Sequence, residues 1–312
     1  MQEEQKYELV IIGAGPAGLS ASIYASRFGI SHVVFGGLMG GTISEAHLVD
    51  NYLGIEDVGG FELSQRFFKH AKKYGVEIFT SLVNKINKKE NDFFEVTFDG
   101  EKKILTKAIL LATGTKRKKI GIKGEDEFFG KGVSYCATCD GFFYKNKRVG
   151  IIGGANSAVS AAVYLSDIAQ EVFLIYRKDV LPAEEYWVKI VKENKKIKIL
   201  YKSNVVEVFG EKRVEGVKLD KDFEGKKELQ LDGLFIECGS DPRVDFTEDL
   251  GIEKDETGFV KIKKGCETSV SGVWAAGDIT DGSNKFFQVI TAAAEGAIAA
   301  KSIYNYLRKQ GK

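Results

Sequence analysis

Two cysteines and a carboxylate that stand close together in the sequence are the residues best suited to do chemistry. Cys136 and Cys139 have two residues between them in the stretch YCATCDGFF (residues 135–143), and Asp140 follows at once. This spacing fits half of a zinc site, a structural disulfide, or a pair whose disulfide opens and closes as the protein works. Thiols in C-x-x-C pairs at helix starts ionise more readily than isolated thiols, which favours exchange chemistry.

The remaining cysteines and histidines argue against the first two alternatives. A zinc site needs four ligands, usually as two short-spaced pairs, but Cys238 and Cys266 stand far apart and the three histidines are distant in sequence. A permanent disulfide across two residues would close a tiny loop and add little stability. We therefore expect no metal site and a redox-active pair, with Cys238 and Cys266 as buried small apolar side chains.

Length and charge exclude several other classes of protein. The 312 residues are enough for two ordinary domains, and 45 basic against 44 acidic side chains give a net charge of +1. This balance argues against a nucleic-acid or membrane-surface partner that is held mainly by charge. No apolar run approaches the ~20 residues that cross a bilayer. The polar first residues lack the apolar core of a signal peptide, so we expect a cytoplasmic protein.

A glycine-rich turn near the start of the chain predicts a dinucleotide site. Residues 7–35 show a strand, the turn GAGPAG (residues 13–18), a helix and a second strand. In such a unit Gly13 makes the tight turn, Gly15 lets the backbone approach a pyrophosphate, and Gly18 lets helix and strand pack closely. The helix start then offers free N–H groups to the phosphates. The alternative is a glycine-rich turn in an α/β domain that binds nothing.

A second copy of this unit follows later in the chain. Residues 148–152 are an expected strand, GGANSA (residues 153–158) an expected turn, residues 159–168 a helix, and residues 171–176 a strand. Two such units imply two dinucleotides and electron transfer between cofactors. Ala155 stands where the middle glycine belongs, and its methyl group should crowd the pyrophosphate.

The residues after the second unit bear on the choice of coenzyme. The strand that ends at Tyr176 is followed by Arg177 and Lys178, where an NAD site usually places an acid for the ribose hydroxyls. Two basic side chains instead suit a 2′-phosphate, so NADPH is favoured over NADH. The alternative is that Arg177 and Lys178 are only solvent-exposed charges at the end of a strand and bind no phosphate.

Further segments extend the first unit and suggest that it is built from both chain ends. A strand over residues 108–112 ends in ATG (residues 112–114), and a strand over residues 272–276 runs into AAGD (residues 275–278). An acid beside a glycine at a strand end can bond the hydroxyls of a ribityl chain. A long helix over residues 287–307 could aim its positive end at an electron-rich ring. Further strands are expected over residues 95–98, 103–105, 205–208, 216–219 and 233–238.

These elements predict the fold class and its boundaries. We expect an α/β protein with two Rossmann-like three-layer dinucleotide-binding domains, the second inserted in the first. The domain boundaries, called the two seams below, should lie near residues 113–119 and 239–245, where glycine or charged residues follow an apolar strand.

The order and spacing of the first turn, CATCDGFFY (residues 136–144), the second turn and AAGD resemble those of the low-molecular-weight thioredoxin reductases, over nearly the whole chain. The resemblance implies a homodimeric, FAD-dependent pyridine nucleotide-disulfide oxidoreductase of class II. Residues 1–113 and 244–312 would form the FAD-binding domain. Residues 114–243 would form the NAD(P)H-binding domain that carries the redox-active C-x-x-C. Electrons would pass from NADPH, with NADH as an alternative, through FAD and the disulfide to thioredoxin or a similar dithiol protein.

The resemblance also assigns roles to single residues. Cys139 would be the sulfur that meets the flavin, Cys136 would attack the partner's disulfide, and Asp140 would be the acid–base group, a role compatible with that of a helix cap. The inserted domain would swivel at the two seams. The FAD contacts would be Gly13, Gly15, Ala17, Gly18, Gly40, Gly41, Thr42, Asn51, Thr113, Gly114, Gly277, Asp278, Gln288 and Val289. The NAD(P)H contacts would be Gly153, Gly154, Asn156, Ser157, Arg177 and Lys178.

The sequence departs from this family mainly at the second turn. Ala155 replaces a glycine, Tyr176 a histidine and Pro182 an arginine, whereas near the flavin Thr42 and Val289 are milder changes. Losing one arginine of a phosphate clamp removes a contact of ~1.5–3 kcal/mol. We therefore expect a weaker NADPH preference than is usual, or dual use of NADH. Alternatives are the same fold with another electron donor or another disulfide partner, or a flavin-binding redox sensor without turnover.

Overall fold

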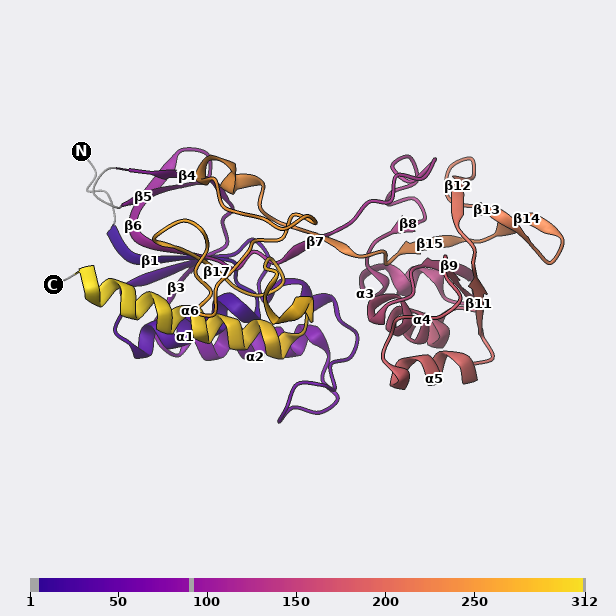
Figure 1. The fold of residues 1–312 in the computed structure, drawn as a ribbon. Helices are drawn as coiled ribbons and strands as arrows, with labels where there is room; N and C mark the ends of the chain where they lie inside the picture. Colours follow the sequence, from indigo (N-terminus) through magenta and orange to yellow (C-terminus); the bar gives the residue numbers. More distant parts are fainter. Residues whose placement is uncertain (1–5, 90–92, 311–312) are drawn as a thin grey trace. The chain divides into compact units, whose positions relative to one another are not determined.

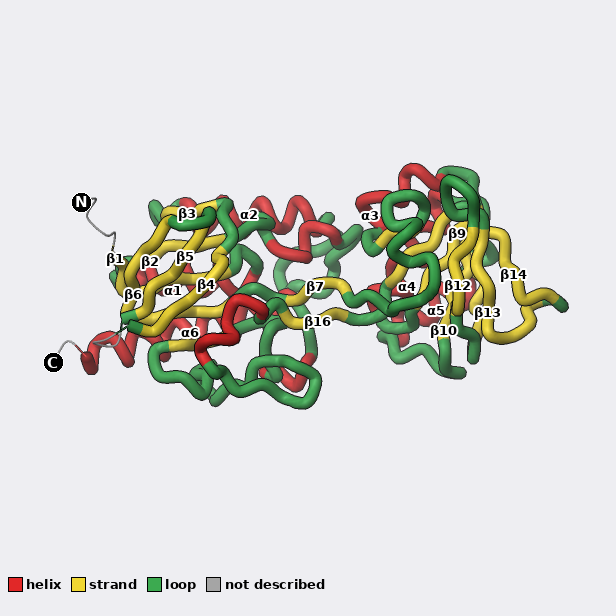
Figure 2. Tube along the Cα trace, turned by 90° about the horizontal axis from the view of Figure 1, so that it is seen from above, coloured by secondary structure: helices red, strands yellow, loops and turns green. Residues whose placement is uncertain are grey.

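The chain forms two compact units, the second of which is inserted in the first. The computed structural model describes residues 6–89 and 93–310, so residues 1–5, 90–92 and 311–312 of the predicted flavin domain lie outside it. The first unit comprises Met1–Lys116 and Asp241–Lys312, and the second comprises Arg117–Ser240 (Figure 1). The chain leaves the first unit at β7 (Thr115–Arg117) and returns at β16 (Ser240–Pro242), and these two strands pair with each other (Figure 2).

The sheet of the first unit is mostly parallel. Its order is β3-β2-β1-β6-β5-β4, with β17 also paired to β6, and only the pairs β4–β5 and β5–β6 are antiparallel. The strands are β1 (Lys6–Ile12), β2 (His32–Phe35), β3 (Glu77–Phe79), β4 (Val83–Lys88), β5 (Phe94–Phe98), β6 (Lys102–Leu111) and β17 (Val273–Ala275). The two strands predicted over residues 103–105 and 108–112 are one strand, because the buried Thr106 hydroxyl is satisfied by the carbonyl of Ala108 at 2.9 Å.

Apolar side chains cover both faces of this sheet. Leu9 and Ile11 of β1 pack in the cluster beneath the helices, whereas Val10 and Ile12 pack in the cluster on the opposite face. Strands that are buried on both faces have continuous apolar runs in their sequences, and the parallel strands of this sheet have such runs. The helical layer consists of α1 (Pro16–Arg27), α2 (Gly60–Lys72) and α6 (Val289–Gln310), which lie together along one side of the sheet in Figure 1.

The second unit has three layers around a parallel sheet of order β11-β10-β9-β15-β8. Apolar clusters lie on both sides of this sheet, one beneath helices and one beneath a small antiparallel sheet. The parallel strands are β8 (Val133–Ser134), β9 (Arg148–Ile152), β10 (Glu171–Tyr176), β11 (Ile197–Tyr201) and β15 (Gly233–Ile236). The helices are α3 (Ala137–Asp140), α4 (Asn156–Ile168) and α5 (Glu185–Glu193). The antiparallel strands are β12 (Val205–Phe209), β13 (Gly216–Phe223) and β14 (Lys226–Gln230).

The predicted fold class is confirmed, with two α/β units that each begin with strand, glycine turn and helix. The helix starts differ slightly from the prediction: α4 starts at Asn156 rather than at residue 159, directly after the turn, and α6 starts at Val289 rather than at residue 287. Within residues 6–89 and 93–310, no helix combines the length and apolar character needed to cross a membrane. The same residues contain no group of three or more His, Cys, Asp or Glu side chains arranged to hold a metal ion.

Candidate functional site

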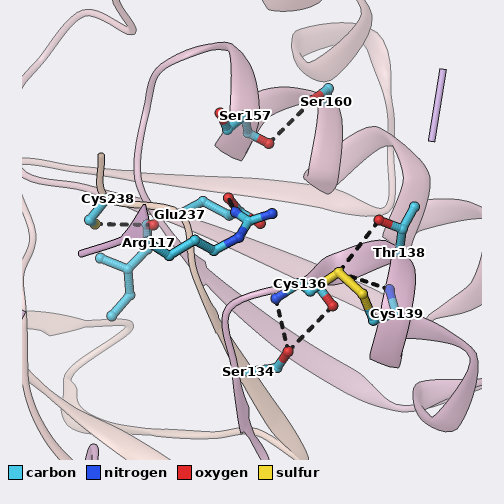
Figure 3. A network of polar contacts seen from close by, with 10 residues as sticks. Arg117, Ser134, Cys136, Thr138, Cys139, Ser157, Ser160, Glu237 and Cys238 are labelled. Carbon is cyan, nitrogen blue, oxygen red and sulfur yellow. Dashed lines mark hydrogen bonds and ion pairs between the residues drawn. A yellow bond between two sulfur atoms is a disulfide. The ribbon is translucent and has the colours of Figure 1, made fainter. Parts of the chain in front are cut away.

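A disulfide joins Cys136 and Cys139 at the start of the short helix α3, two residues after β8 ends (Figure 3). Cys136 is the N-cap residue of this helix, and its sulfur accepts a hydrogen bond from the backbone N–H of Cys139 at 3.2 Å. The Ser134 hydroxyl accepts from the N–H of Cys136 at 3.0 Å and donates to its carbonyl at 3.3 Å. The pair is therefore held by its own local backbone, as a reactive pair requires.

Glu125 is a support for this segment that sequence reasoning missed. Its side chain is buried and accepts backbone N–H groups of residues 120, 121 and 122 at 3.1, 2.6 and 3.2 Å. The Tyr135 hydroxyl donates to the same carboxylate. Burial, followed by this hydrogen bond, raises the pKa of Tyr135 far above its usual range, so the phenol stays a donor. No motif marks Glu125 in the sequence, because its partners are three backbone N–H groups and one hydroxyl ten residues further on.

The two sulfurs differ in exposure, and two exposed aromatic residues lie nearby. Cys139 is exposed, whereas Cys136 and Asp140 are half-buried. The backbone N–H of Asp140 donates to the carbonyl of Cys136 at 3.2 Å. Phe142 and Phe143, which follow Asp140 after one glycine, are 72% and 70% exposed. An exposed apolar pair beside a disulfide is a surface suited to a protein partner.

The first glycine turn has a geometry that fits a pyrophosphate. A Cβ on Gly13 would lie 2.0 Å from the carbonyl oxygen of Ala112, and one on Gly18 would lie 1.8 Å from that of Gly13. These two glycines are therefore required by the packing of the protein itself. A Cβ on Gly15 would meet nothing closer than 3.7 Å. The fold itself therefore does not require a glycine at this position. A phosphate that approaches this backbone would require one, because a side chain would stand in its way.

The loop after β2 lies against this turn. The N–H of Gly40 donates to the carbonyl of Ala14 at 2.9 Å, and Gly41 approaches Gly15 so closely that its Cβ would lie 3.0 Å from the Cα of Gly15. Thr42 follows in the same short helix, Gly41–Glu45. The structure thus brings the predicted Gly40–Thr42 loop to the predicted phosphate turn.

Other predicted flavin residues are also brought together within the first unit. The Asn51 side-chain amide donates to the side-chain oxygen of Gln288 at 3.0 Å, immediately before α6 begins at Val289. Ala17 lies against Gly277, where an added Cβ would meet its methyl at 3.0 Å. The Thr113 hydroxyl donates to the carbonyl of Arg243 at 2.8 Å, so Thr113 and the adjacent Gly114 lie where the chain leaves and re-enters the unit.

Asp278 lies in the loop after β17 beside a second carboxylate, that of Glu295. Burial, reinforced by the Glu295 charge, raises the pKa of Asp278 from 3.8 to about 6. Glu295, which is buried in α6, accepts hydrogen bonds from the N–H of Gly277 at 2.8 Å and the hydroxyl of Ser283 at 2.5 Å. Glu295 was not predicted from the sequence. An acid in a stretch of small residues, AAAEGAIAA, is the signal that could have found it.

The second turn repeats the first with one change. Ala155 has φ −84° and ψ 179°, and Gly15 has φ −84° and ψ −173°, so the middle residue of both turns has the same extended backbone. The methyl of Ala155 is therefore tolerated by the fold. A Cβ on Gly153 would lie 2.4 Å from the carbonyl oxygen of Glu237, and one on Gly154 would lie 2.5 Å from the Tyr176 ring.

The predicted coenzyme contacts lie around this turn. Asn156 and Ser157 begin α4, and Arg177 and Lys178 are exposed directly after β10. The Asn156 amide is engaged with Glu184, to whose carboxylate it donates at 3.0 Å and from whose backbone N–H it accepts at 2.8 Å. An acidic side chain thus lies at the helix start where phosphates are expected, a contact that the sequence pattern did not reveal.

The two remaining cysteines differ from each other. Cys266 is buried, and burial raises the pKa of its thiol to about 12. The prediction for Cys238 was wrong, since it is only half-buried. Its thiol donates to the carbonyl of Ile152 at 3.2 Å, and burial raises its pKa to about 11. Cys238 is less buried because it follows the end of β15, at the edge of the sheet.

Strand register brings the disulfide and the second turn to one edge of the sheet. Ile152 of β9 is paired with Ile236 of β15, and Phe235 of β15 with Ser134 of β8. Gly153 and Cys136 follow one and two residues after these pairs, so both stand at the carboxyl ends of parallel strands. In open α/β sheets this edge is where ligands bind.

Comparison with known proteins gives a consistent result. The family model for the pyridine nucleotide-disulphide oxidoreductases matches residues 7–296. A thioredoxin reductase of Bacillus subtilis is 39% identical over 99% of this chain and 97% of its own length. The solved thioredoxin reductases of Lactococcus lactis and T. acidophilum are 34% and 38% identical, with TM-scores of 0.92 and 0.90. Each covers 97% of this chain and 99% of the solved chain.

These matches extend over both units and confirm the resemblance stated from the sequence. They imply a flavin and a nicotinamide cofactor, because both belong to the chemistry of this family. The chain belongs to the pyridine nucleotide-disulphide oxidoreductases and, within them, to the low-molecular-weight thioredoxin reductases.

Proposed function

We propose that this protein is an NAD(P)H-dependent thioredoxin-disulfide reductase that uses FAD. The observation that carries the proposal is the Cys136–Cys139 disulfide at the same sheet edge as a dinucleotide turn. A disulfide in that position can receive electrons that enter the protein at a nucleotide. The similarity to thioredoxin reductases along the whole chain supports thioredoxin, or a similar small dithiol protein, as the acceptor.

FAD is assigned to the discontinuous domain of residues 1–113 and 244–312. Gly15 and the start of α1 would hold its pyrophosphate through backbone N–H groups, whereas Gly13 would shape the turn, since its own N–H donates to the carbonyl of Phe35 at 2.6 Å. Asp278 would accept hydrogen bonds from ribityl hydroxyls, and the Asn51–Gln288 pair would lie near the ring. Supporting contacts are assigned to Ala17, Gly18, Gly40, Gly41, Thr42, Thr113, Gly114, Gly277 and Val289.

The nicotinamide coenzyme is assigned to the domain of residues 114–243. Backbone N–H groups at the start of α4 (Asn156, Ser157) would bind the pyrophosphate beside the turn Gly153–Gly154, which Gly153 shapes while its own N–H donates to the carbonyl of Ile175 at 3.1 Å. Arg177 and Lys178 would face a 2′-phosphate, which favours NADPH. When bound, FAD would accept a hydride from the nicotinamide and supply the two electrons that open the disulfide.

The thiols then carry out exchange. Two electrons and two protons convert the Cys136–Cys139 disulfide into two thiols, and Cys139 is assigned as the sulfur nearer the flavin. The Cys136 thiolate attacks the partner's disulfide and forms a mixed disulfide, while Asp140 donates the proton that the leaving thiolate takes up. The Cys139 thiolate next attacks the Cys136 sulfur, which releases the second partner thiol and restores the disulfide.

The surroundings of the pair support a protein as the acceptor. Phe142 and Phe143, three and four residues after Cys139, present two exposed rings. An apolar pair next to an exposed sulfur favours docking of another protein over a small molecule. We further propose that the enzyme works as a homodimer in the cytoplasm, and that its two domains change position during turnover.

An anaerobic turnover assay tests the function. Purified protein with FAD, NADPH or NADH, and thioredoxin from the same organism should oxidise coenzyme for many turnovers and produce thioredoxin thiols. Bound FAD and a titratable disulfide without multiple turnover would instead indicate a redox sensor. If neither coenzyme bleaches the flavin, but chemically reduced enzyme still reduces thioredoxin, another electron donor supplies the enzyme.

A further inference from the structure

The strand order of the second unit indicates where each half of a dinucleotide would lie. From β9 the chain passes through α4 to β10 on one side, whereas β15 and β8 lie on the other side. Dinucleotides bind across the carboxyl ends of the strands at such a reversal, with the pyrophosphate at the helix start. The adenosine half would lie over the end of β10, beside Arg177. The nicotinamide half would therefore lie over the end of β15, on the side of the disulfide.

An Arg–Glu ion pair occupies that second position. Glu237 is the first residue after β15, and its backbone N–H donates to the carbonyl of Ile152 at 2.8 Å. Continuing the strand pairs past their last residues places Glu237 opposite Gly153 of the second turn on one side and opposite Cys136 on the other. Its side chain is 4% exposed and forms an ion pair with Arg117 of β7. Figure 3 shows the pair with Ser157 of α4 to one side and Cys136 to the other.

The pair is held firmly in this position. Cys238 fixes the end of β15 to β9 through its hydrogen bond to Ile152, and the carbonyl of Glu237 packs against Gly153. The Arg117 side chain is 33% exposed, but the buried Glu237 carboxylate would lose its partner without regaining full hydration, so separating the pair is costly. An acid that ends a buried apolar strand is unusual in itself.

We propose that the Arg117–Glu237 ion pair weakens binding of the whole coenzyme by obstructing the nicotinamide half of the crevice. A complete coenzyme has to displace the pair, whereas an adenosine fragment that ends at the pyrophosphate side does not. The pair is also neutral as a whole, so it offers the phosphates no net attraction. This inference rests on the proposed function, since it takes the second turn as the coenzyme site.

Equilibrium binding to the unaltered, oxidised holoenzyme gives the first test. Isothermal titration with NADP⁺ and with 2′,5′-ADP should show that the fragment binds at least as tightly as the whole coenzyme. In a crevice without an obstruction the nicotinamide half would add contacts and tighten binding. NADP⁺ that binds more than about tenfold tighter than the fragment, equivalent to ~1.4 kcal/mol, would overturn the inference.

A double variant gives the second test. Arg117→Ala/Glu237→Ala removes both charges together, so neither is left buried without a partner. The Kd for NADP⁺ should fall by about tenfold, or ~1.4 kcal/mol, while the Kd for 2′,5′-ADP stays unchanged. The matched control is Arg148→Ala/Glu171→Ala, which removes an Arg–Glu pair at the first residues of β9 and β10, the opposite edge of the same sheet. This control should change neither Kd.

The outcomes separate this inference from the proposed function. An unchanged Kd for NADP⁺, or equal shifts for coenzyme and fragment, would overturn the inference alone. Binding of neither ligand by any of the proteins would overturn the proposed coenzyme site, and the inference with it. If the double variant fails to fold, as judged by circular dichroism, the comparison in the unaltered protein still decides.

Discussion

The backbone N–H of Gly277 donates a hydrogen bond of 2.8 Å to the carboxylate of Glu295, and this bond ties the loop after β17 to the middle of α6. The same carboxylate accepts from the hydroxyls of Thr280 at 3.2 Å and Ser283 at 2.5 Å. One buried side chain thus organises the loop that carries Asp278. Glu295 is a positioning residue in our proposal, because it acts on the flavin site through this loop.

Removing the Glu295 carboxylate should destabilise the first unit. Glu295→Ala leaves the Gly277 N–H and the Ser283 hydroxyl without their acceptor, whereas the Thr280 hydroxyl keeps the Gly277 carbonyl at 3.0 Å, and this should lower the free energy of unfolding by about 2–4 kcal/mol. Urea denaturation measures this loss, and FAD titration of the apoprotein should show weaker binding. The control is Glu256→Ala, an exposed glutamate of the same unit, which should change stability little. Equal effects of the two substitutions would contradict the role of Glu295.

Asp278 should make the stability of the flavin-free protein depend on pH. Its pKa is raised to about 6 from 3.8, so between these values the folded state keeps a proton that the unfolded chain has released. The contribution of Asp278 to stability is therefore greatest below about pH 4 and is lost as the pH rises through 6. Asp278→Asn should remove this loss and gain about 2–3 kcal/mol over the unaltered protein at pH 7, but little at pH 4.

Urea midpoints of the flavin-free protein across this pH range provide the measurement for Asp278. The exposed Asp50 of the same unit offers a matched control, because Asp50→Asn makes the same chemical change on the surface. A pH profile that is the same for Asp278→Asn and for the unaltered protein would show that Asp278 is not the group responsible.

Local rules of chain geometry predicted the turns and the disulfide segment well. Gly13 and Gly18 have to be glycine because an added Cβ would overlap backbone oxygen atoms, and such constraints leave a motif in the sequence. Contacts between distant segments leave no such pattern. Glu125 binds backbone groups, and Arg117 meets Glu237 only because β7 and β15 converge in space. Thr106 likewise interrupts the apolar pattern of β6 although it is buried within it.

Substituting either cysteine of the pair should abolish thioredoxin reduction. Cys136→Ser and Cys139→Ser each prevent disulfide formation, so turnover with thioredoxin should fall by at least about 10³-fold. Reduction of the flavin by coenzyme should persist, because it precedes the disulfide in the proposed order. Anaerobic stopped-flow absorbance separates the two steps. Cys238→Ser is the control and should retain turnover, since that thiol lies outside the pair.

Arg177 should set the preference between coenzymes. If it faces the 2′-phosphate, Arg177→Ala removes a charge-assisted contact of ~1.5–3 kcal/mol and should raise the KM for NADPH by about tenfold or more. The KM for NADH should not change, because NADH lacks that phosphate. We also expect the unaltered enzyme to prefer NADPH by less than a thousandfold, since Pro182 stands where an arginine is usual. Steady-state kinetics with both coenzymes decides, and equal losses with NADPH and NADH would place Arg177 away from the phosphate.

Glu184 should weaken coenzyme binding through its charge. Its carboxylate accepts from the Asn156 amide at the first residue of α4, so it lies near the phosphates that this helix start would bind. Glu184→Gln keeps a hydrogen-bonding side chain but removes a like charge at an exposed site, where such effects amount to about 0.2–1 kcal/mol. The Kd should therefore fall about two- to fivefold for both NADP⁺ and 2′,5′-ADP, which share the phosphates. Glu185→Gln makes the same change one residue further on, in the first turn of α5, and should have a smaller effect. A change in Kd confined to NADP⁺ would mean that Glu184 acts on the nicotinamide half instead. An equal change in Kd for Glu185→Gln would mean that only the net charge of this region matters, and not the position of Glu184.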